Sequence, residues 1–520
     1  MNGAENLLNT LVDAGVEVCF ANPGTSEMQL VSAIGNSASM RAVLCLFEGV
    51  VSGAADGYGR MADKPALTLL HLGSGFANSM ANQHNAKRAH VPLLNMVGDH
   101  ATYHLQYDAP LTSNVKAYCE LASHWVGVSD SADNLAAVGA AAVQAALRGN
   151  GQIASFIAPA NHAWEPASIS APTLPLPAVR KVDDAAIERA ASALSSGAPA
   201  ALFLGGRALR AEALTLAGRI AQTCGARIIC ETFPSRLQRG SGRVSVERLP
   251  YFAEQAMDAL KECRQLITVG AKAPVSFFAY PGKPSWLVPE ECTVTSLAAV
   301  EEDLLDALTR LAEKLGANKN AATLEPAADM AAPNGLLTPA AIGQSINRLL
   351  PNDAIVSDEA ATCGLGIFAC TEHAAAHDWL TLTGGAIGQG LPLALGAAIA
   401  CPQRKVIALQ ADGGGMYTLQ ALWSMVREQT DVTVVIMNNN SYAILNIELA
   451  RVGAGQPTAK TLSMLSLANP KLNWVEIAQG MGMSAKRANS AQEFDELFAA
   501  AMRHKGPQLI EAMVVQQMPS

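Results

Sequence analysis

The sequence lacks several features that would assign a chain to a class of protein at once. None of its apolar runs reaches the roughly 20 consecutive residues that a membrane-spanning helix needs, although half of its 520 residues are hydrophobic. No cluster of lysine or arginine stands out and the formal net charge is -9, so the chain has no electrostatic footprint for nucleic acid. We therefore expect neither a membrane nor a nucleic-acid partner.

The sequence also argues against paired cysteines and against an export signal. The ten cysteines include no C-x-x-C pair and most lie among apolar residues, which argues against a disulfide framework and against a zinc site. The first 18 residues carry acids where a secretory signal has a basic region followed by an apolar one. These observations favour free thiols and a cytoplasmic location.

Short apolar runs that end in Gly, Asn or Asp recur along the chain, and most are followed by a helical pattern. This alternation is typical of parallel strands that are buried on both faces and covered by helices. We expect strands at residues 66–70, 91–97, 200–204, 265–269, 405–409 and 432–437. In such sheets, ligands bind at the carboxyl ends of the strands.

The chain is too long for one hydrophobic core, and two stretches divide it. Residues 171–177 are dense in proline, and residues 316–335 are poor in large apolar side chains. We predict an α/β fold with three parallel-sheet domains, at residues 1–170, 180–318 and 335–520, of which the second is Rossmann-like.

The most specific motif is Asp412 with the three glycines that follow it, together with Asn438, Asn439 and Asn440 after the next expected strand. Hard divalent cations such as Mg²⁺ prefer carboxylate, amide and carbonyl oxygens and complete their coordination with phosphates of a ligand. Glycines at a helix start leave backbone N–H groups free to bind such phosphates. The alternative is a tight glycine turn with a capping Asp.

This motif resembles the thiamine diphosphate signature, Gly-Asp-Gly followed one helix and one strand later by Asn-Asn. Ala411 stands where the signature has its first glycine, which adds one methyl group. The resemblance implies Asp412 and Asn439 as side-chain ligands of Mg²⁺ and the carbonyl of Ser441 as a third ligand. It implies that Gly413, Gly414 and Tyr442 border the diphosphate.

Nearly the whole chain resembles one branch of that family, the benzoylformate decarboxylase and acetolactate synthase group. Residues 20–27, 46–49 and 54–60 look like the strands, turn and helix around its catalytic glutamate, here Glu48. A carboxyl group hydrogen-bonded to the cofactor's pyrimidine promotes the imino tautomer that removes the C2 proton. The alternative is a helix-capping Glu. The resemblance makes the first domain pyrimidine-binding and the third diphosphate-binding.

The substrate side of the site is predicted from the same resemblance. His71 stands where these decarboxylases have a His and acetolactate synthases usually have Thr, and a neutral-pH acid or base there favours decarboxylation. A buried structural His is the alternative. Thr25 matches a Ser that contacts the substrate carboxylate, and Asn78 matches a position at the cofactor. Asp99, His100 and His104 lie in the loop where relatives place a Gln or paired His near the substrate, and the alternative for the two histidines is an exposed surface loop.

The remaining positions concern the cofactor's shape and the central domain. Ile387, with Gly385 before it, matches the apolar residue that bends the cofactor, and Glu359 and Thr362 match positions at the diphosphate pocket. The central domain shows neither a G-x-G-x-x-G run nor the Arg-Phe-Asp found in acetolactate synthases, so we do not expect FAD. Residues 274–280 offer no counterpart of the decarboxylases' second active-site histidine.

These inferences predict a thiamine diphosphate- and Mg²⁺-dependent enzyme for non-oxidative decarboxylation of a 2-oxo acid, with carboligation as a side or main reaction. One alternative is the acetolactate synthase-type condensation of pyruvate with a second 2-oxo acid, and another is a non-catalytic paralogue. In the family, Glu48 and Asp412 would come from different subunits, so a homodimer is the minimum and a homotetramer is common.

Overall fold

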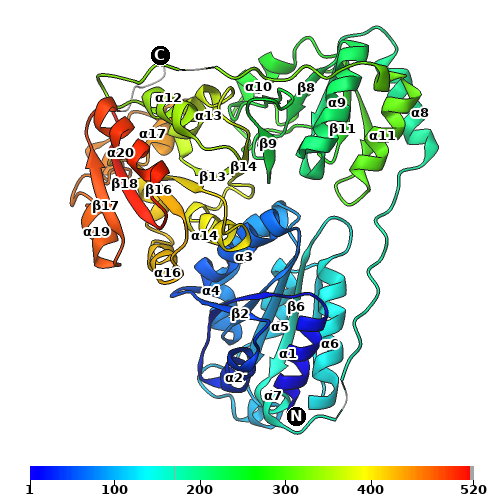
Figure 1. The fold of residues 1–520 in the computed structure, drawn as a ribbon, viewed down its shortest axis with the longest axis vertical. Coiled ribbons are helices and arrows are strands. Elements are labelled where there is room, and N and C mark those ends of the chain that lie inside the picture. Colours follow the sequence, from blue (N-terminus) through cyan, green and yellow to red (C-terminus); the bar gives the residue numbers. More distant parts are fainter. Residues whose placement is uncertain (169, 329, 516–520) are drawn as a thin grey trace.

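The structure is a computed structural model that describes residues 1–168, 170–328 and 330–515. Residue 169, residue 329 and residues 516–520, which fall in the predicted domain and linker ranges, lie outside the described residues. The chain forms three sheets, which we call with their helices the N-terminal, central and C-terminal units. Figure 1 shows them in blue to cyan, green, and yellow to red, respectively. The predicted α/β class with three mostly parallel sheets is confirmed.

The N-terminal unit is a six-stranded parallel sheet in the order β2-β1-β3-β4-β6-β5. Apolar residues of α1, α2 and α6 cover one face, and those of α3, α4 and α5 cover the other. The strands are β1 (Val18–Asn22), β2 (Arg41–Leu44), β3 (Ala66–Leu70), β4 (Leu93–Asp99), β5 (Trp125–Val128) and β6 (Ile153–Pro159). The helices are α1 (Gly3–Asp13), η1 (Thr25–Glu27), α2 (Met28–Asn36), α3 (Glu48–Ala62), α4 (Leu72–Arg88), η2 (Thr102–Tyr107), α5 (Val115–Ala122), α6 (Ala132–Ala146) and α7 (Ala160–Trp164).

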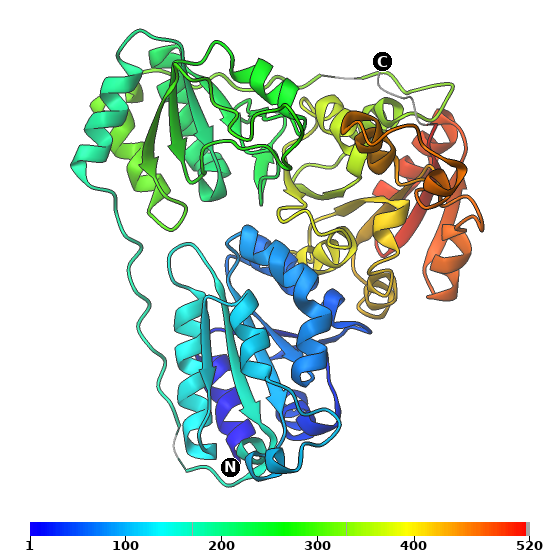
Figure 2. The ribbon, with the colours of Figure 1, turned by 180° about the vertical axis from the view of Figure 1, so that it is seen from behind.

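The central unit is a five-stranded parallel sheet in the order β10-β8-β7-β11-β12. An extended segment, exposed at residues 172–179, leads to it from the N-terminal unit (Figure 2). The strands are β7 (Ala200–Leu204), β8 (Arg227–Cys230), β10 (Glu247–Arg248), β11 (Gln265–Val269) and β12 (Thr293–Ala298). The helices are α8 (Asp184–Leu194), η3 (Gly206–Leu209), α9 (Ala211–Cys224), α10 (Ala253–Leu260), α11 (Leu304–Lys314) and η4 (Ala317–Lys319).

The C-terminal unit is a seven-stranded sheet in the order β17-β18-β16-β15-β13-β14-β9, and its edge strand β9 belongs by sequence to the central segment. The strands are β9 (Leu237–Arg239), β13 (Ala354–Glu359), β14 (His377–Thr381), β15 (Val406–Ala411), β16 (Val432–Asn438), β17 (Ser484–Ala488) and β18 (Gln508–Met513). The helices are α12 (Pro339–Leu349), η5 (Ala361–Cys363), α13 (Gly364–Cys370), α14 (Gly390–Ala400), α15 (Asp412–Gly415), α16 (Ala421–Arg427), α17 (Ala443–Arg451), α18 (Ala459–Ser463), α19 (Trp474–Gly480) and α20 (Ala491–Arg503).

Helices α3 and α14 join the N-terminal and C-terminal units. Their apolar residues belong to one buried cluster that reaches both sheets. The two backbones approach closely because glycines lie at the crossing: a Cβ on Gly396 would come within 1.8 Å of the Ala54 carbonyl oxygen. The relative position of these two units therefore depends on a dry, tightly packed contact.

Two further predictions concern thiols and membranes. All ten cysteines lie in described residues and all are free, seven of them buried. Of the helices in the described ranges, none is both long and apolar enough to cross a membrane.

Candidate active site

The C-terminal unit gathers three polar groups at the carboxyl edge of its sheet. Strands β13, β15 and β16 are neighbours, and they end at Glu359, Ala411 and Asn438. Glu359, Asp412 and Asn439 therefore stand side by side at one edge, because parallel strands end on the same side. The structure thus brings together the residues that the sequence motif placed on two strands.

Asp412 is the most deeply buried of the predicted metal ligands, with 2% of its surface exposed. Its Oδ1 accepts the Gly413 N–H at 2.9 Å, and its Oδ2 accepts the N–H groups of Asn439 and Asn440 at 3.2 and 2.8 Å. Burial raises the pKa of this carboxyl to about 6 in spite of those donors. No Lys, Arg or His of the described chain pairs with it, so its charge is not compensated within the protein.

Polar contacts of Asn438 hold the loop after β16 in place. The side chain of Asn438 accepts the Asn440 N–H at 3.1 Å and donates to Glu511 Oε1 at 2.7 Å. Glu511, fully buried on β18, is also bonded to Arg487 at 2.9 Å. Asn440 has a φ of 55°, a left-handed conformation that Asn tolerates better than most residues. Residues 438–441 are therefore fixed by a chain of polar contacts.

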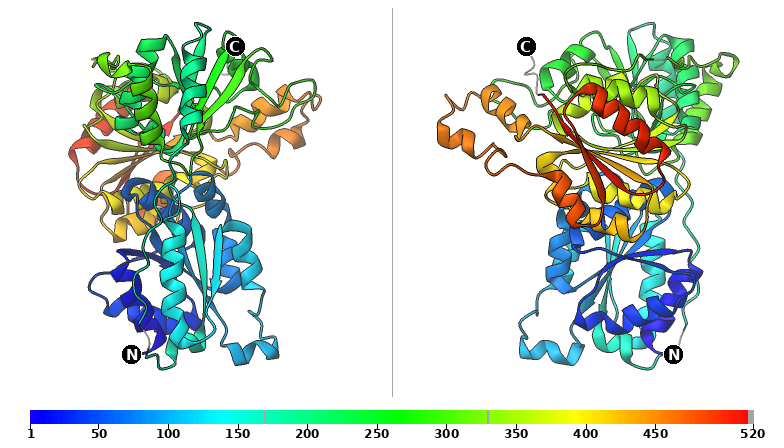
Figure 3. Two further views of the ribbon diagram at one scale, coloured as in Figure 1. Left: turned by 90° about the vertical axis from the view of Figure 1, so that its right-hand side faces the viewer. Right: turned by 60° about the vertical axis from the view of Figure 1, so that its left-hand side comes forward.

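Asn439 and Ser441 complete the loop. Asn439 Oδ1 accepts the Ser441 N–H at 3.0 Å, and the Ser441 hydroxyl donates to the Leu465 carbonyl at 3.3 Å. The ring of Tyr442 lies over Gly413, where a Cβ would come within 2.4 Å of it. Helices α17 and α18 follow, and this orange segment projects from the rest of the unit in Figure 3.

Glu359 holds the glycine loop that precedes α14. Its two carboxylate oxygens accept the N–H groups of Gly388 and Gly390 at 2.7 and 2.5 Å. Both oxygens of this carboxylate are thus occupied by backbone donors of the loop. Burial raises the pKa of Glu359. Ile387, part-buried, lies within this loop, and Gly385 turns it with a φ of 76°.

Thr362 lies beside the same edge of the sheet. It is part-buried in η5, the turn that directly follows β13.

In the N-terminal unit, Glu48 is the first residue of α3 and is 8% exposed. Asn78 Nδ2 of α4 donates to Glu48 Oε2 at 3.0 Å. A Cβ built on Gly75 would lie 3.2 Å from Glu48 Oε1 and 3.3 Å from the Cβ of His71. The structure therefore gathers Glu48, His71 and Asn78 around the first turn of α4.

The remaining predicted residues of this unit lie along the same edge. Thr25 is exposed at the start of η1, directly after β1 and its turn. Asp99 ends β4, and the rings of His100 and His104 lie 5.6 Å apart in the segment that follows. Strands β1, β3 and β4 are neighbours, so these residues and His71 share one carboxyl edge.

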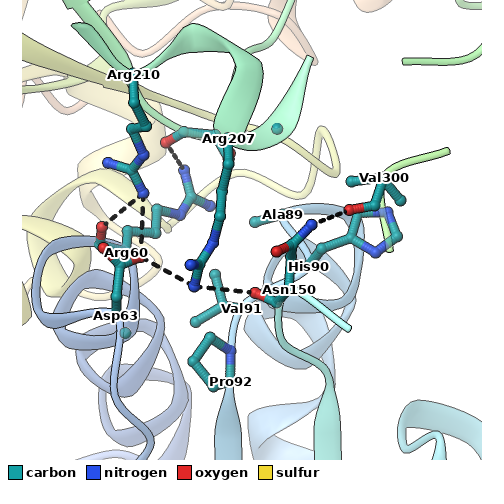
Figure 4. A pocket seen from close by; sticks show the side chains of 13 residues that line it. Arg60, Asp63, Ala89, His90, Val91, Pro92, Asn150, Arg207, Arg210 and Val300 are labelled. Carbon is teal, nitrogen blue, oxygen red and sulfur yellow. Dashed lines mark hydrogen bonds and ion pairs between the residues drawn. The ribbon is translucent and has the colours of Figure 1, made fainter. Parts of the chain in front are cut away.

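The far end of α3 is anchored in the central unit. At 1.5 Å per residue this 15-residue helix is about 22 Å long, so its last turn is remote from Glu48. There, Arg210 lies 3.3 Å from Asp63 and donates to the Arg60 carbonyl at 3.3 Å, and Arg207 lies 3.4 Å from Asp63. Figure 4 shows these side chains around a small recess between the two units. The ion pairs around this recess connect the C-terminal end of α3 to the central unit.

Comparisons with known proteins identify the family. Residues 1–121 match the model described as "Thiamine pyrophosphate enzyme, N-terminal TPP binding domain", and residues 365–512 match the corresponding C-terminal TPP binding domain. A protein of Mycobacterium tuberculosis named "Putative acetolactate synthase large subunit IlvX" is 49% identical over 515 residues, which cover 99% of each chain. This chain belongs to the thiamine pyrophosphate enzyme family.

Two further similar proteins match this thiamine pyrophosphate enzyme over at least 96% of its length. A benzoylformate decarboxylase of Pseudomonas aeruginosa is 26% identical, with 96% of each chain covered. The solved structure of a thiamine diphosphate-dependent 4-hydroxybenzoylformate decarboxylase from Rhodococcus jostii RHA1 superposes with a TM-score of 0.87, at 23% identity and with 99% of each chain covered. The latter similarity shows the three-sheet fold.

The residues of this thiamine pyrophosphate enzyme fit a divalent cation at Asp412. A buried carboxylate without a cationic partner is unfavourable unless a cation is bound beside it. The amide of Asn439 and the carbonyl groups of the same loop are the oxygen donors that Mg²⁺ accepts together with phosphates. Within the described residues, no cluster of three or more His, Cys, Asp or Glu side chains provides an alternative all-protein metal site.

One polar residue of the site, Glu27, lies within residues 20–27, where the sequence alone indicates no role for it. It follows Ser26 at the end of η1, and its side chain contacts His71. From the sequence alone, Glu27 is interpreted as a helix cap, because it lies four residues after Pro23 in a turn from a strand to a helix. Only the pairing of β1 with β3 shows that it faces the histidine.

Proposed function

We propose that this chain catalyses the thiamine diphosphate- and Mg²⁺-dependent, non-oxidative decarboxylation of a 2-oxo acid, with carboligation when a second carbonyl compound replaces the proton. The observation that carries the proposal is the grouping of His71 with Glu48 and Asn78 around Gly75. A titratable imidazole beside the activating glutamate provides the proton that release of an aldehyde requires.

The diphosphate half of the site would be formed by the C-terminal unit. Asp412, Asn439 and the carbonyl of Ser441 would hold Mg²⁺, and the backbone N–H groups beside Gly413 and Gly414 would face the phosphates. The bound cation would offset the buried negative charge of Asp412. Ile387 would rest against the cofactor's rings and keep the cofactor bent.

Glu48 would act on the pyrimidine. Its Oε2 is engaged by Asn78, which leaves Oε1 beside Gly75 for a ring nitrogen. When bound, thiamine diphosphate supplies an electron sink for the carbon that loses carbon dioxide. Glu48 holds or moves the proton that switches the pyrimidine between its tautomers, and Thr25, exposed at the same edge, would contact the substrate carboxylate.

The complete site would need two chains. Among the described residues, no hydrogen bond or ion pair connects Glu48 with the group around Asp412. We propose a homodimer as the minimum active species, in which Glu48 of one chain works with Asp412 of the other, and a homotetramer as the common assembly.

A second candidate is the acetolactate synthase-type condensation of pyruvate with a second 2-oxo acid. It is favoured by the 49% identity to a relative whose printed name is that of an acetolactate synthase large subunit. It is opposed by His71, since the synthases usually carry Thr there.

A substrate screen separates these functions. Purified enzyme with added Mg²⁺ and thiamine diphosphate would be supplied with pyruvate and with branched-chain, phenyl and CoA-linked 2-oxo acids. Carbon dioxide with an equal amount of aldehyde supports the decarboxylase, and acetolactate from pyruvate supports the synthase. Cofactor binding without turnover of any of these acids would overturn both and leave a non-catalytic paralogue.

A further inference from the structure

Glu27 forms a buried dyad with His71. It is fully buried, and its carboxylate oxygens lie 2.9 and 3.1 Å from His71 Nδ1. We infer that Glu27 is a positioning residue that fixes the ring orientation and the tautomer of His71. This inference rests on the proposed role of His71 in proton transfer.

The carboxylate of Glu27 is surrounded by donors. The Gly24 N–H donates to Oε2 at 2.8 Å, and the Ser26 hydroxyl donates to Oε1 at 2.6 Å. These two donors on one buried carboxylate suit its ionised form. An ionised carboxylate can only accept, so the proton between the two side chains belongs to Nδ1 of His71.

This arrangement determines which ring nitrogen does chemistry. With Nδ1–H committed to Glu27, the other nitrogen, Nε2, is the one that exchanges a proton with a reacting molecule. The His71 side chain is 19% exposed whereas Glu27 is fully buried, so only the histidine is accessible. Glu27 therefore acts through His71 and does not itself touch the substrate.

Two glycines provide the space for the dyad. A Cβ on Gly98 of β4 would lie 1.9 Å from Glu27 Oε1, and a Cβ on Gly24 would lie 2.1 Å from His71 Nδ1. Side chains at either position would occupy the place of the carboxylate or of the ring. The contact is therefore set by three neighbouring strand ends, those of β1, β3 and β4.

The tautomer is tested first, without any substrate. In the ¹⁵N-histidine spectrum of the parent protein, assigned by comparison with His71→Gln, His71 is expected to show a protonated Nδ1. In Glu27→Gln this state should be lost or mixed with the Nε2–H tautomer, because the amide can both donate and accept. An Nε2–H tautomer in the parent, or an unchanged His71 signal in Glu27→Gln, would overturn the inference.

Kinetics provide the second test, with phenylglyoxylate and pyruvate as the probes. We expect Glu27→Gln to lower kcat by about 10–100-fold with little change in KM, as part of the roughly 10²–10⁴-fold that a positioned acid or base contributes. In the His71→Ala background the same change should cost almost nothing further, since Glu27 acts through the histidine. An equal loss of kcat in both backgrounds would contradict the inference.

A matched control variant completes the experiment, together with an outcome that distinguishes failure of this inference from failure of the proposed function. Glu120→Gln makes the same substitution at an exposed residue of α5 that pairs with Lys116, and it should leave the spectrum and kcat unchanged. If the parent turns over neither probe, the proposed function fails for these acids, while the tautomer still decides the role of Glu27.

Discussion

Asn78 donates a hydrogen bond to Glu48 across 3.0 Å, and so joins the second turn of α4 to the first residue of α3. The two helices pack against each other along one face of the N-terminal sheet. The contact holds one oxygen of the carboxyl group and leaves the other beside Gly75.

Replacing this carboxyl group tests its role directly. Glu48→Gln keeps the hydrogen bond from Asn78 possible but removes the transferable proton. We expect turnover of any accepted 2-oxo acid to fall by about 10²–10⁴-fold. Exchange of the cofactor's C2 proton, followed by ¹H NMR in deuterated buffer, should slow in parallel, while affinity for thiamine diphosphate changes little. Undiminished turnover in Glu48→Gln would remove the basis of the mechanism.

The buried carboxylate of Asp412 leads to a second prediction. Asp412→Asn removes a buried charge that no cationic side chain of the described residues neutralises, and we expect the Mg²⁺-dependent affinity for thiamine diphosphate to fall by more than the roughly 10–100-fold that loss of a residue behind a metal ligand costs. Calorimetric titration of the cofactor with and without Mg²⁺ measures this. The control is Asp258→Asn in α10, where the carboxylate is exposed and bonded to Lys261. Full retention of Mg²⁺-dependent binding by Asp412→Asn would place the cation elsewhere.

The left-handed backbone at Asn440 supports a third prediction. Its N–H is the group bonded to Asp412 and Asn438, so both Asn440→Gly and Asn440→Val keep these bonds available. Valine is disfavoured at a φ of 55° by about 1–2 kcal/mol or more, whereas glycine is not. Asn440→Val should weaken cofactor binding by about tenfold and lower the midpoint of thermal unfolding, with Asn440→Gly near the parent. Equal behaviour of the two variants would show that the backbone conformation is unimportant.

Glu231, directly after β8, provides a pH-dependent prediction. Burial raises its pKa to about 7 despite the hydrogen bond from the Gly206 N–H. The folded protein thus binds this proton more tightly than the unfolded chain, so the group's contribution to stability is present below about pH 4.5 and is lost as the pH rises through about 7. Glu231→Gln abolishes this loss and should be more stable than the parent by on the order of 2 kcal/mol at pH 8.

The measurement for Glu231 is chemical denaturation of parent and variant at a series of pH values. The advantage of Glu231→Gln should grow between pH 5 and pH 8 and be small at pH 5. A constant difference across this range would show that the carboxyl is not the titrating group.

The strands of the fold were predictable where burial on both faces left an uninterrupted apolar run. The runs at residues 66–70, 200–204 and 265–269 coincide with β3, β7 and β11, and the run at 432–437 lies within β16. Asp412 and Asn439 could be paired from sequence because each directly follows such a run and parallel strands end on one side.

Contacts that depend on strand order could not be predicted in the same way. The Glu27–His71 dyad forms because β1 and β3 pair although the two residues are 44 positions apart, and neither residue carries a local signal of this. Glu359 was expected at the diphosphate, but its carboxylate direction is set by the N–H groups of a loop 29 to 31 residues later. Local patterns identify the edge of a sheet, whereas the partner of each side chain depends on the packed structure.

Strand β9 lies between Cys230 and Glu247 in the sequence, yet it pairs with β14 through Leu237, Gln238 and Arg239. A fragment that begins at residue 335 would lose this strand and present the hydrogen-bonding edge of β14 to solvent, where other chains could add to it. The isolated C-terminal third should accordingly self-associate. In the full chain, β9 covers this edge and so protects the C-terminal sheet from aggregation.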